Sequence, residues 1–159
     1  MTQRLNYAQQ SPQAFRKYLE FSNTLKSGTI DETTRHLVNI RASQINGCAF
    51  CVDMHIKEAR IHGERELRLH HLAIWRESSL FDARERAALA WTETLTKLPE
   101  GGVPDEIYEQ ARAQFSEQEL ADLTFCVMAI NGWNRASIAF KNEPGSADKV
   151  YGLDKAGLE

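Results

Sequence analysis

Apolar residues recur three and four positions apart along almost the whole chain, the spacing that places side chains on one face of a helix. Phe15, Tyr18 and Leu19 form such a stripe near the start. No segment of useful length alternates apolar and polar residues as a half-buried strand would. The pattern predicts an all-α fold, with helices over about 12–27, 32–45, 48–62, 64–75, 83–97, 104–114 and 117–140.

Short polar signals separate these helices. Asp31 and Asp82 are suited to cap the helices that follow them, and residues 116–119 (Ser-Glu-Gln-Glu) have the pattern of a capping box. Asn46-Gly47 is a strong turn signal, so Cys48 is expected at the N-terminus of a central helix. The break at 98–103 is interpreted as a loop, because helical patterning resumes directly after it.

The length of 159 residues suits one domain, which we assign to residues 1–159. Its core is expected to span about 10–141. The tail, 142–159, contains one proline and three glycines and is predicted to be poorly ordered or dependent on a partner.

Composition excludes several classes of function. The net charge of -3 offers no basic surface for nucleic acid or for an anionic membrane. No apolar run approaches the roughly 20 residues that cross a bilayer. Residues 1–7 contain no long apolar stretch, so a secretory signal is not expected and a cytoplasmic location is predicted.

The candidate chemistry lies in residues 46–55. Cys48, Cys51 and His55 are spaced to share one helical face, which places an imidazole one turn from Cys51. A cysteine at a helix start is favoured as a thiolate, the nucleophilic form. In a reducing cytosol a close dithiol is more often catalytic or metal-binding than structural. We interpret the pair as a centre that cycles between dithiol and disulfide. Cys126 lies in an apolar stretch and is expected to be a small core residue.

Other interpretations of the same residues remain open. Cys48, Cys51, His55 and His36 could together bind zinc. The dithiol could instead serve a general protein-disulfide oxidoreductase or a redox sensor with weak peroxidase activity. The polar cluster at 131–135, within an otherwise apolar helix, is interpreted as a hydrogen-bonded patch in helix packing, with contact to the active-site wall as the alternative.

Residues 41–55 resemble the core motif of the alkylhydroperoxidase D (AhpD)-like proteins of the carboxymuconolactone decarboxylase superfamily. Residues 72–77, 85–93 and 129–135 are similar to later parts of that family, so the resemblance covers roughly 10–141. The resemblance implies a single-domain helical bundle that assembles into homo-oligomers, either trimers or hexamers. It also implies a thiol peroxidase activity that reduces hydroperoxides. The oxidised pair would be reduced back to the dithiol by an external dithiol, either a lipoyl group or a thioredoxin-like protein. No metal, flavin, haem or nucleotide cofactor is expected.

The same resemblance assigns Cys48 and Cys51 to the redox pair and His55 to a proton relay. It makes Cys51 the peroxidatic sulfur and Cys48 the resolving one. The helix dipole instead favours Cys48 as the more acidic thiol, so the two roles stay open.

One position departs from the family pattern. The relay glutamate of the family is replaced here by His36, and Glu32, one turn earlier, could partner that imidazole. Phe50 stands where a more elaborate relay has a histidine. Because a neutral imidazole brings no negative charge, we expect slower or more pH-dependent peroxide turnover, and a rate increase in His36→Glu.

Overall fold

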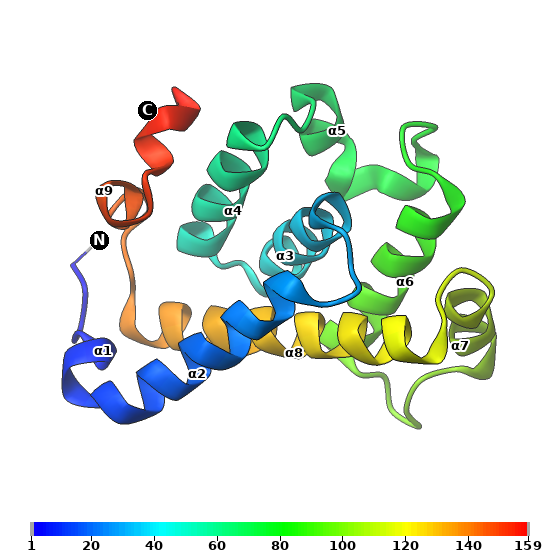
Figure 1. Ribbon diagram of the computed structural model, residues 1–159, viewed down its shortest axis with the longest axis horizontal. Helices are drawn as coiled ribbons and strands as arrows, with labels where there is room; N and C mark the ends of the chain where they lie inside the picture. The colour runs from blue at the N-terminus through cyan, green and yellow to red at the C-terminus, as the bar shows by residue number, and fades with distance from the viewer. Residues whose placement is uncertain (1, 159) are drawn as a thin grey trace.

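The computed structural model describes residues 2–158, and among these residues every regular element is a helix (Figure 1). The all-α prediction is therefore confirmed. The α-helices are α1 (Tyr7–Gln10), α2 (Pro12–Thr24), α3 (Glu32–Asn46), α4 (Ala49–Ile61), α5 (Glu66–His71), α6 (Ala83–Lys97), α7 (Asp105–Arg112), α8 (Glu117–Phe140) and α9 (Asp148–Tyr151). Three 3₁₀ segments join them: η1 (Leu25–Ser27), η2 (Leu72–Glu77) and η3 (Leu153–Ala156).

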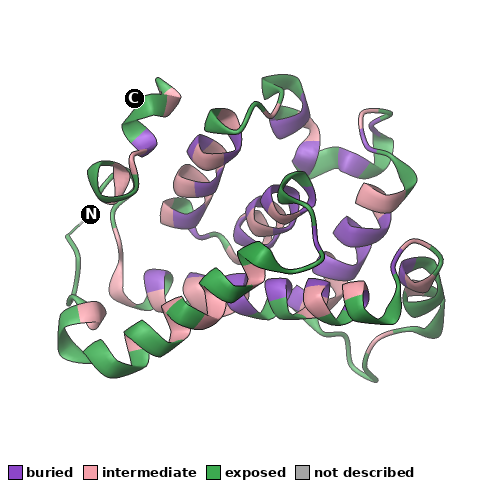
Figure 2. Cartoon of the chain, in the orientation of Figure 1, coloured by how far each residue is buried: buried purple, intermediate pink, exposed green. Residues whose placement is uncertain are grey.

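Helix α3 is the central element of the bundle. It packs against α4, α6 and α8, and Figure 1 shows it between α4 and α6, with α8 running across the same end of all three. Its inward face is fully buried at Leu37, Val38, Ile40 and Ala42 (Figure 2). Cys126 lies in the core cluster on the α6–α8 side, which confirms its expected structural role.

Local signals set the helix ends that matter for the site. Asp31 accepts a hydrogen bond from the backbone N–H of Thr34, which begins α3. Gly47 ends α3 in the left-handed region, with φ of 70°, a conformation that glycine adopts without steric cost. This single-residue reversal brings Cys48 directly to the start of α4.

Two regions differ from the sequence-based expectation. The helix expected over 64–75 ends at His71 and continues as the 3₁₀ segment η2, within which Ile74 leaves helical geometry (φ −120°, ψ 29°). The tail is predicted from the sequence to be poorly ordered or dependent on a partner, whereas in the structure η3 packs on α4 of the same chain and buries Leu153. The ammonium of Lys57 on α4 also lies 2.7 Å from a carboxylate oxygen of Asp148 and contributes to this packing. No helix in the described chain is long and apolar enough to cross a membrane.

Candidate active site

The site begins at the turn between α3 and α4. Cys48 is the N-cap of α4, and its sulfur accepts a hydrogen bond from the backbone N–H of Cys51 at 3.4 Å. Both sulfurs are free thiols, and both residues are buried, with 2% and 1% of their surfaces exposed. The backbone geometry thus places a sulfur where the positive end of the helix dipole favours negative charge.

The two thiols differ in acidity. A hydrogen bond from the Cys51 thiol lowers the pKa of Cys48 to about 7, and the Cys51 N–H, Asn134 and Ser137 add to this effect against the opposing effect of burial. The pKa of Cys51 is raised because its thiol donates that bond and because it is buried. Cys48 is therefore the thiol that ionises first, and with a pKa of about 7 it is partly thiolate at neutral pH, in the direction that the helix-dipole argument predicts.

Asn134 of α8 connects the dithiol turn to the rest of the bundle. Its side chain is fully buried; its carbonyl oxygen accepts a hydrogen bond of 2.8 Å from the Asn46 amide, and its own amide donates to the Ser43 hydroxyl at 3.0 Å. The polar patch is thus part of helix packing, as expected, and Asn134 also stabilises the sulfur charge. Ser137 was missed by the sequence analysis, although it lies one turn after Asn134 on the same buried face of α8.

His55 follows Cys51 by one turn of α4 and is paired with a carboxylate. Its Nδ1 lies 3.0 Å from Oε2 of Glu58, at hydrogen-bond distance. Burial would raise the pKa of Glu58, but the hydrogen bond and charge of His55 outweigh it and lower that pKa to about 2. Glu58 was not identified from the sequence, although its position three residues after His55 on one helix was a readable signal.

His36 lies in α3 beside this pair but is hydrogen-bonded elsewhere. Its Nε2 is 3.0 Å from Nδ1 of His62, while its Nδ1 is buried with no hydrogen-bond partner among residues 2–158. Burial lowers the pKa of His36 to about 4, assisted by the nearby His62 and His55 and opposed by Glu58 and Glu32. The ring is therefore neutral at physiological pH. Glu32, the partner predicted for it, lies in the same cluster and acts on its charge, but its Oε1 faces Nδ1 of His62 at 3.7 Å.

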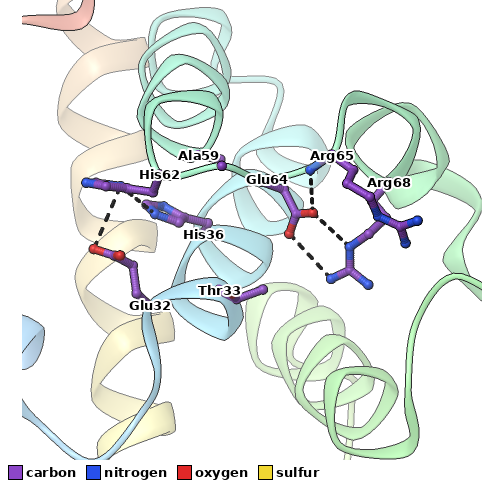
Figure 3. A pocket seen from close by; sticks show the side chains of 9 residues that line it. Glu32, Thr33, His36, Ala59, His62, Glu64, Arg65 and Arg68 are labelled. Carbon is purple, nitrogen blue, oxygen red and sulfur yellow. Dashed lines mark hydrogen bonds and ion pairs between the residues drawn. The ribbon is translucent and has the colours of Figure 1, made fainter.

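The structure does not support the zinc set considered from the sequence. In the part of the chain that the structure describes, one group of three potential ligands converges, with all ligand atoms within 4.8 Å of one another: Glu32, His36 and His62. The dithiol and His55 are not part of it. This group lines one side of a cavity of about 270 Å³, and Glu64, Arg65 and Arg68 line the other (Figure 3).

Known proteins of similar sequence and structure place the chain in a family. Residues 12–94, more than half of the chain, match the carboxymuconolactone decarboxylase family. YdfG of Bacillus subtilis, an uncharacterised protein, is 40% identical over 146 residues, which cover 92% of this chain and 99% of YdfG.

Solved structures agree with this assignment. ATU0492 of Agrobacterium tumefaciens, a protein of unknown function and a candidate AhpD antioxidant defence protein, is similar with a TM-score of 0.87 and 42% identity, over 90% of this chain and 98% of that one. The AhpD core of a peroxidase-related protein from Ralstonia eutropha shares the fold at 21% identity, with a TM-score of 0.77 over 87% and 74% of the two chains. The chain therefore belongs to the carboxymuconolactone decarboxylase family and has the AhpD-like fold.

Proposed function

We propose that this protein is a thiol peroxidase that reduces hydroperoxides through a Cys48–Cys51 dithiol and disulfide cycle. The observation that carries the proposal is the contact between two buried thiols at the start of α4, where Cys48 is the N-cap and the more acidic thiol and Cys51 donates a hydrogen bond to it. A nucleophilic thiolate with a second thiol in contact is the arrangement that peroxide reduction with internal disulfide closure requires.

The chemical cycle has three steps. In the first, a thiolate sulfur attacks the hydroperoxide; an S–O bond forms as the O–O bond breaks, and the leaving alkoxide takes a proton to become an alcohol. In the second, the other sulfur attacks the sulfenic acid, so that an S–S bond forms and water leaves. In the third, an external dithiol reduces the disulfide by exchange and is itself oxidised.

His55 and Glu58 are the groups we assign to proton transfer in this cycle. His55 lies one helical turn from Cys51, and the Glu58 carboxylate fixes the orientation of its ring and stabilises the imidazolium that forms when it takes a proton. Glu58 thereby supplies the negative charge that His36 lacks. His36 stays a proposed relay member, because it lies within electrostatic reach of both residues.

The roles of the two sulfurs follow from their acidity in our proposal. Since Cys48 carries the charge in the resting dithiol, it is the sulfur we expect to attack first, with Cys51 resolving; the family resemblance favours the reverse order. Burial of both sulfurs favours a small hydroperoxide as oxidant and a slender reductant such as a lipoyl group over a bulky protein thiol. We also propose that the chain works as a homo-oligomer, a trimer or hexamer.

Stopped-flow reaction with an organic hydroperoxide tests the proposal. Wild type is expected to lose two thiols per chain and two daltons in mass, whereas Cys48→Ser and Cys51→Ser cannot close the disulfide. The single variant that still forms a sulfenic acid identifies the attacking sulfur. Cys126→Ser, in the apolar core, is the matched control and should react as wild type does. Fast reaction with a disulfide substrate but not with the hydroperoxide would instead favour a disulfide oxidoreductase.

A further inference from the structure

Away from the dithiol, three side chains with metal-binding chemistry meet at the mouth of a cavity. Glu32 and His36 are one helical turn apart at the start of α3, and His62 is the residue that ends α4 (Figure 3). Nε2 of His36 lies 3.0 Å from Nδ1 of His62, and Oε1 of Glu32 lies 3.7 Å from the same Nδ1. From this arrangement we propose that Glu32, His36 and His62 form a binding site for a divalent transition-metal ion, with Zn²⁺ the best match.

The separations between the donor atoms suit one shared ion. Zinc binds imidazole nitrogens at about 2.0–2.1 Å, so two nitrogens on one tetrahedral ion stand about 3.3 Å apart. The distance of 3.0 Å between the two rings is close to that value, and a small rotation of the exposed His62 ring accommodates the ion. Two imidazoles and one carboxylate form a ligand set that suits zinc and other first-row metals better than calcium or magnesium.

The site has both a rigid and an accessible side. His36 is buried, with 5% of its surface exposed, and is held by the central helix. The side chains of Glu32 and His62 are 53% and 40% exposed, so an ion can enter from solvent. Three protein ligands leave the fourth position open toward the cavity of about 270 Å³, where a water molecule or a small anion completes the coordination.

Charged residues near the three ligands affect how readily the site accepts a cation. Arg68, across the cavity, is ion-paired with Glu64 and Glu85 and does not oppose a cation with its full charge. Among the described residues, Arg35 lies 4.0 Å from Glu32 and competes for this carboxylate, and Arg65 also lines the cavity. Glu58 makes no hydrogen bond to the His36 ring, but its negative charge acts on that imidazole and favours a cation bound there.

The site shares His36 with the proposed relay but contains neither sulfur, so it can be tested with the dithiol removed. In a Cys48→Ser/Cys51→Ser protein, calorimetric titration with Zn²⁺ is expected to show one ion bound per chain. Glu32→Gln and His62→Ala are each expected to weaken binding by at least about tenfold. Both residues are exposed at helix ends, so the fold should survive, and circular dichroism verifies this. His70→Ala is the matched control, because that imidazole is exposed on α5 and faces Glu66.

Cobalt gives an independent readout. Co²⁺ added to the wild-type protein is expected to show visible ligand-field bands without thiolate-to-metal charge transfer, and His62→Ala should abolish them. Failure of the cysteine-free protein to bind a stoichiometric ion, or binding that His62→Ala leaves unchanged, would overturn the proposal. Neither result bears on the peroxidase cycle, whose own test is the hydroperoxide reaction.

Discussion

The imidazole of His55 and the carboxylate of Glu58 lie 3.0 Å apart on α4, with Nδ1 of the ring facing Oε2 of the acid. The pair follows the dithiol along the same helix, so a carboxylate lies beside His55 although position 36 carries none. In the proposed relay, this acid three residues after His55 takes the place of the glutamate that the family resemblance puts on the preceding helix.

Replacing Glu58 by Gln should slow peroxide reduction. Glutamine retains a hydrogen-bond acceptor for His55 but carries no charge to stabilise the imidazolium, so we expect the second-order rate constant to fall by about 10–100-fold. Stopped-flow kinetics across pH measures this. Glu66→Gln, which removes an exposed carboxylate paired with Arg60, serves as control and should leave the rate unchanged. Equal rates in the Glu58 and Glu66 variants would remove Glu58 from the relay.

The same substitution should change the dependence of stability on pH. The pKa of Glu58 is lowered in the folded state from 4.5 to about 2. A depressed carboxyl pKa stabilises the fold fully above the unfolded value, and this contribution is lost as pH falls from about 4.5 to about 2. Glu58→Gln is therefore expected to be less stable than wild type at neutral pH by about 1 kcal/mol. Urea unfolding at several pH values should show that the difference in free energy of unfolding between the two proteins becomes smaller in acid. A difference that stays constant with pH would contradict the link between stability and the protonation of Glu58.

The acidity of Cys48 provides a third expectation. Its pKa of about 7 predicts that thiolate absorbance and the rate of alkylation rise through neutral pH and then level off. Ser137→Ala removes one hydrogen bond to the thiolate, so the midpoint should move to higher pH, with a loss of stability of about 1 kcal/mol or less. Ser146→Ala, in the tail, removes a hydroxyl that donates to the backbone carbonyl of Glu143 in its own turn, and it should not move the midpoint. A midpoint that persists in Cys48→Ser would assign the ionisation to another group.

Much of the fold was predictable because its signals are local. Seven expected helices correspond to α2–α8, and the caps at Asp82 and Ser116 form the capping boxes that begin α6 and α8. The shortest helices were not predicted. Helices α1 and α9 have four residues each, too few to show a helical repeat of apolar residues. The tail packs on α4 partly through Lys57, 91 residues before Asp148, and no local pattern in the tail predicts that contact.

The residues of the candidate site also fall into two groups, those that local spacing brings together and those that only the tertiary fold brings together. Cys48, Cys51 and His55 lie within eight residues on one helix, so spacing alone brings them together. His62 reaches His36 only because the end of α4 packs beside the start of α3, a tertiary contact without a sequence signal. The sequence identified His36 as a departure from the family but not its actual partner.

The packing of α2 on α8 depends on a single glycine. A Cβ added to Gly132 would lie 1.9 Å from the Tyr18 hydroxyl oxygen, which donates a hydrogen bond of 2.9 Å to the carbonyl of Ala129. Gly132→Ala must therefore push the tyrosine ring away and break that bond, and it should lower the free energy of unfolding by about 1–3 kcal/mol.

A double-mutant cycle separates this clash from the general effect of alanine in a helix. Tyr18→Ala removes the ring and costs stability by itself, but in that background Gly132→Ala has nothing to displace. Since alanine has the higher helix propensity, the second substitution should then be neutral or stabilising by up to about 1 kcal/mol. Denaturant unfolding of the four proteins measures the interaction energy, and additive effects would show that the tyrosine ring does not require glycine at position 132.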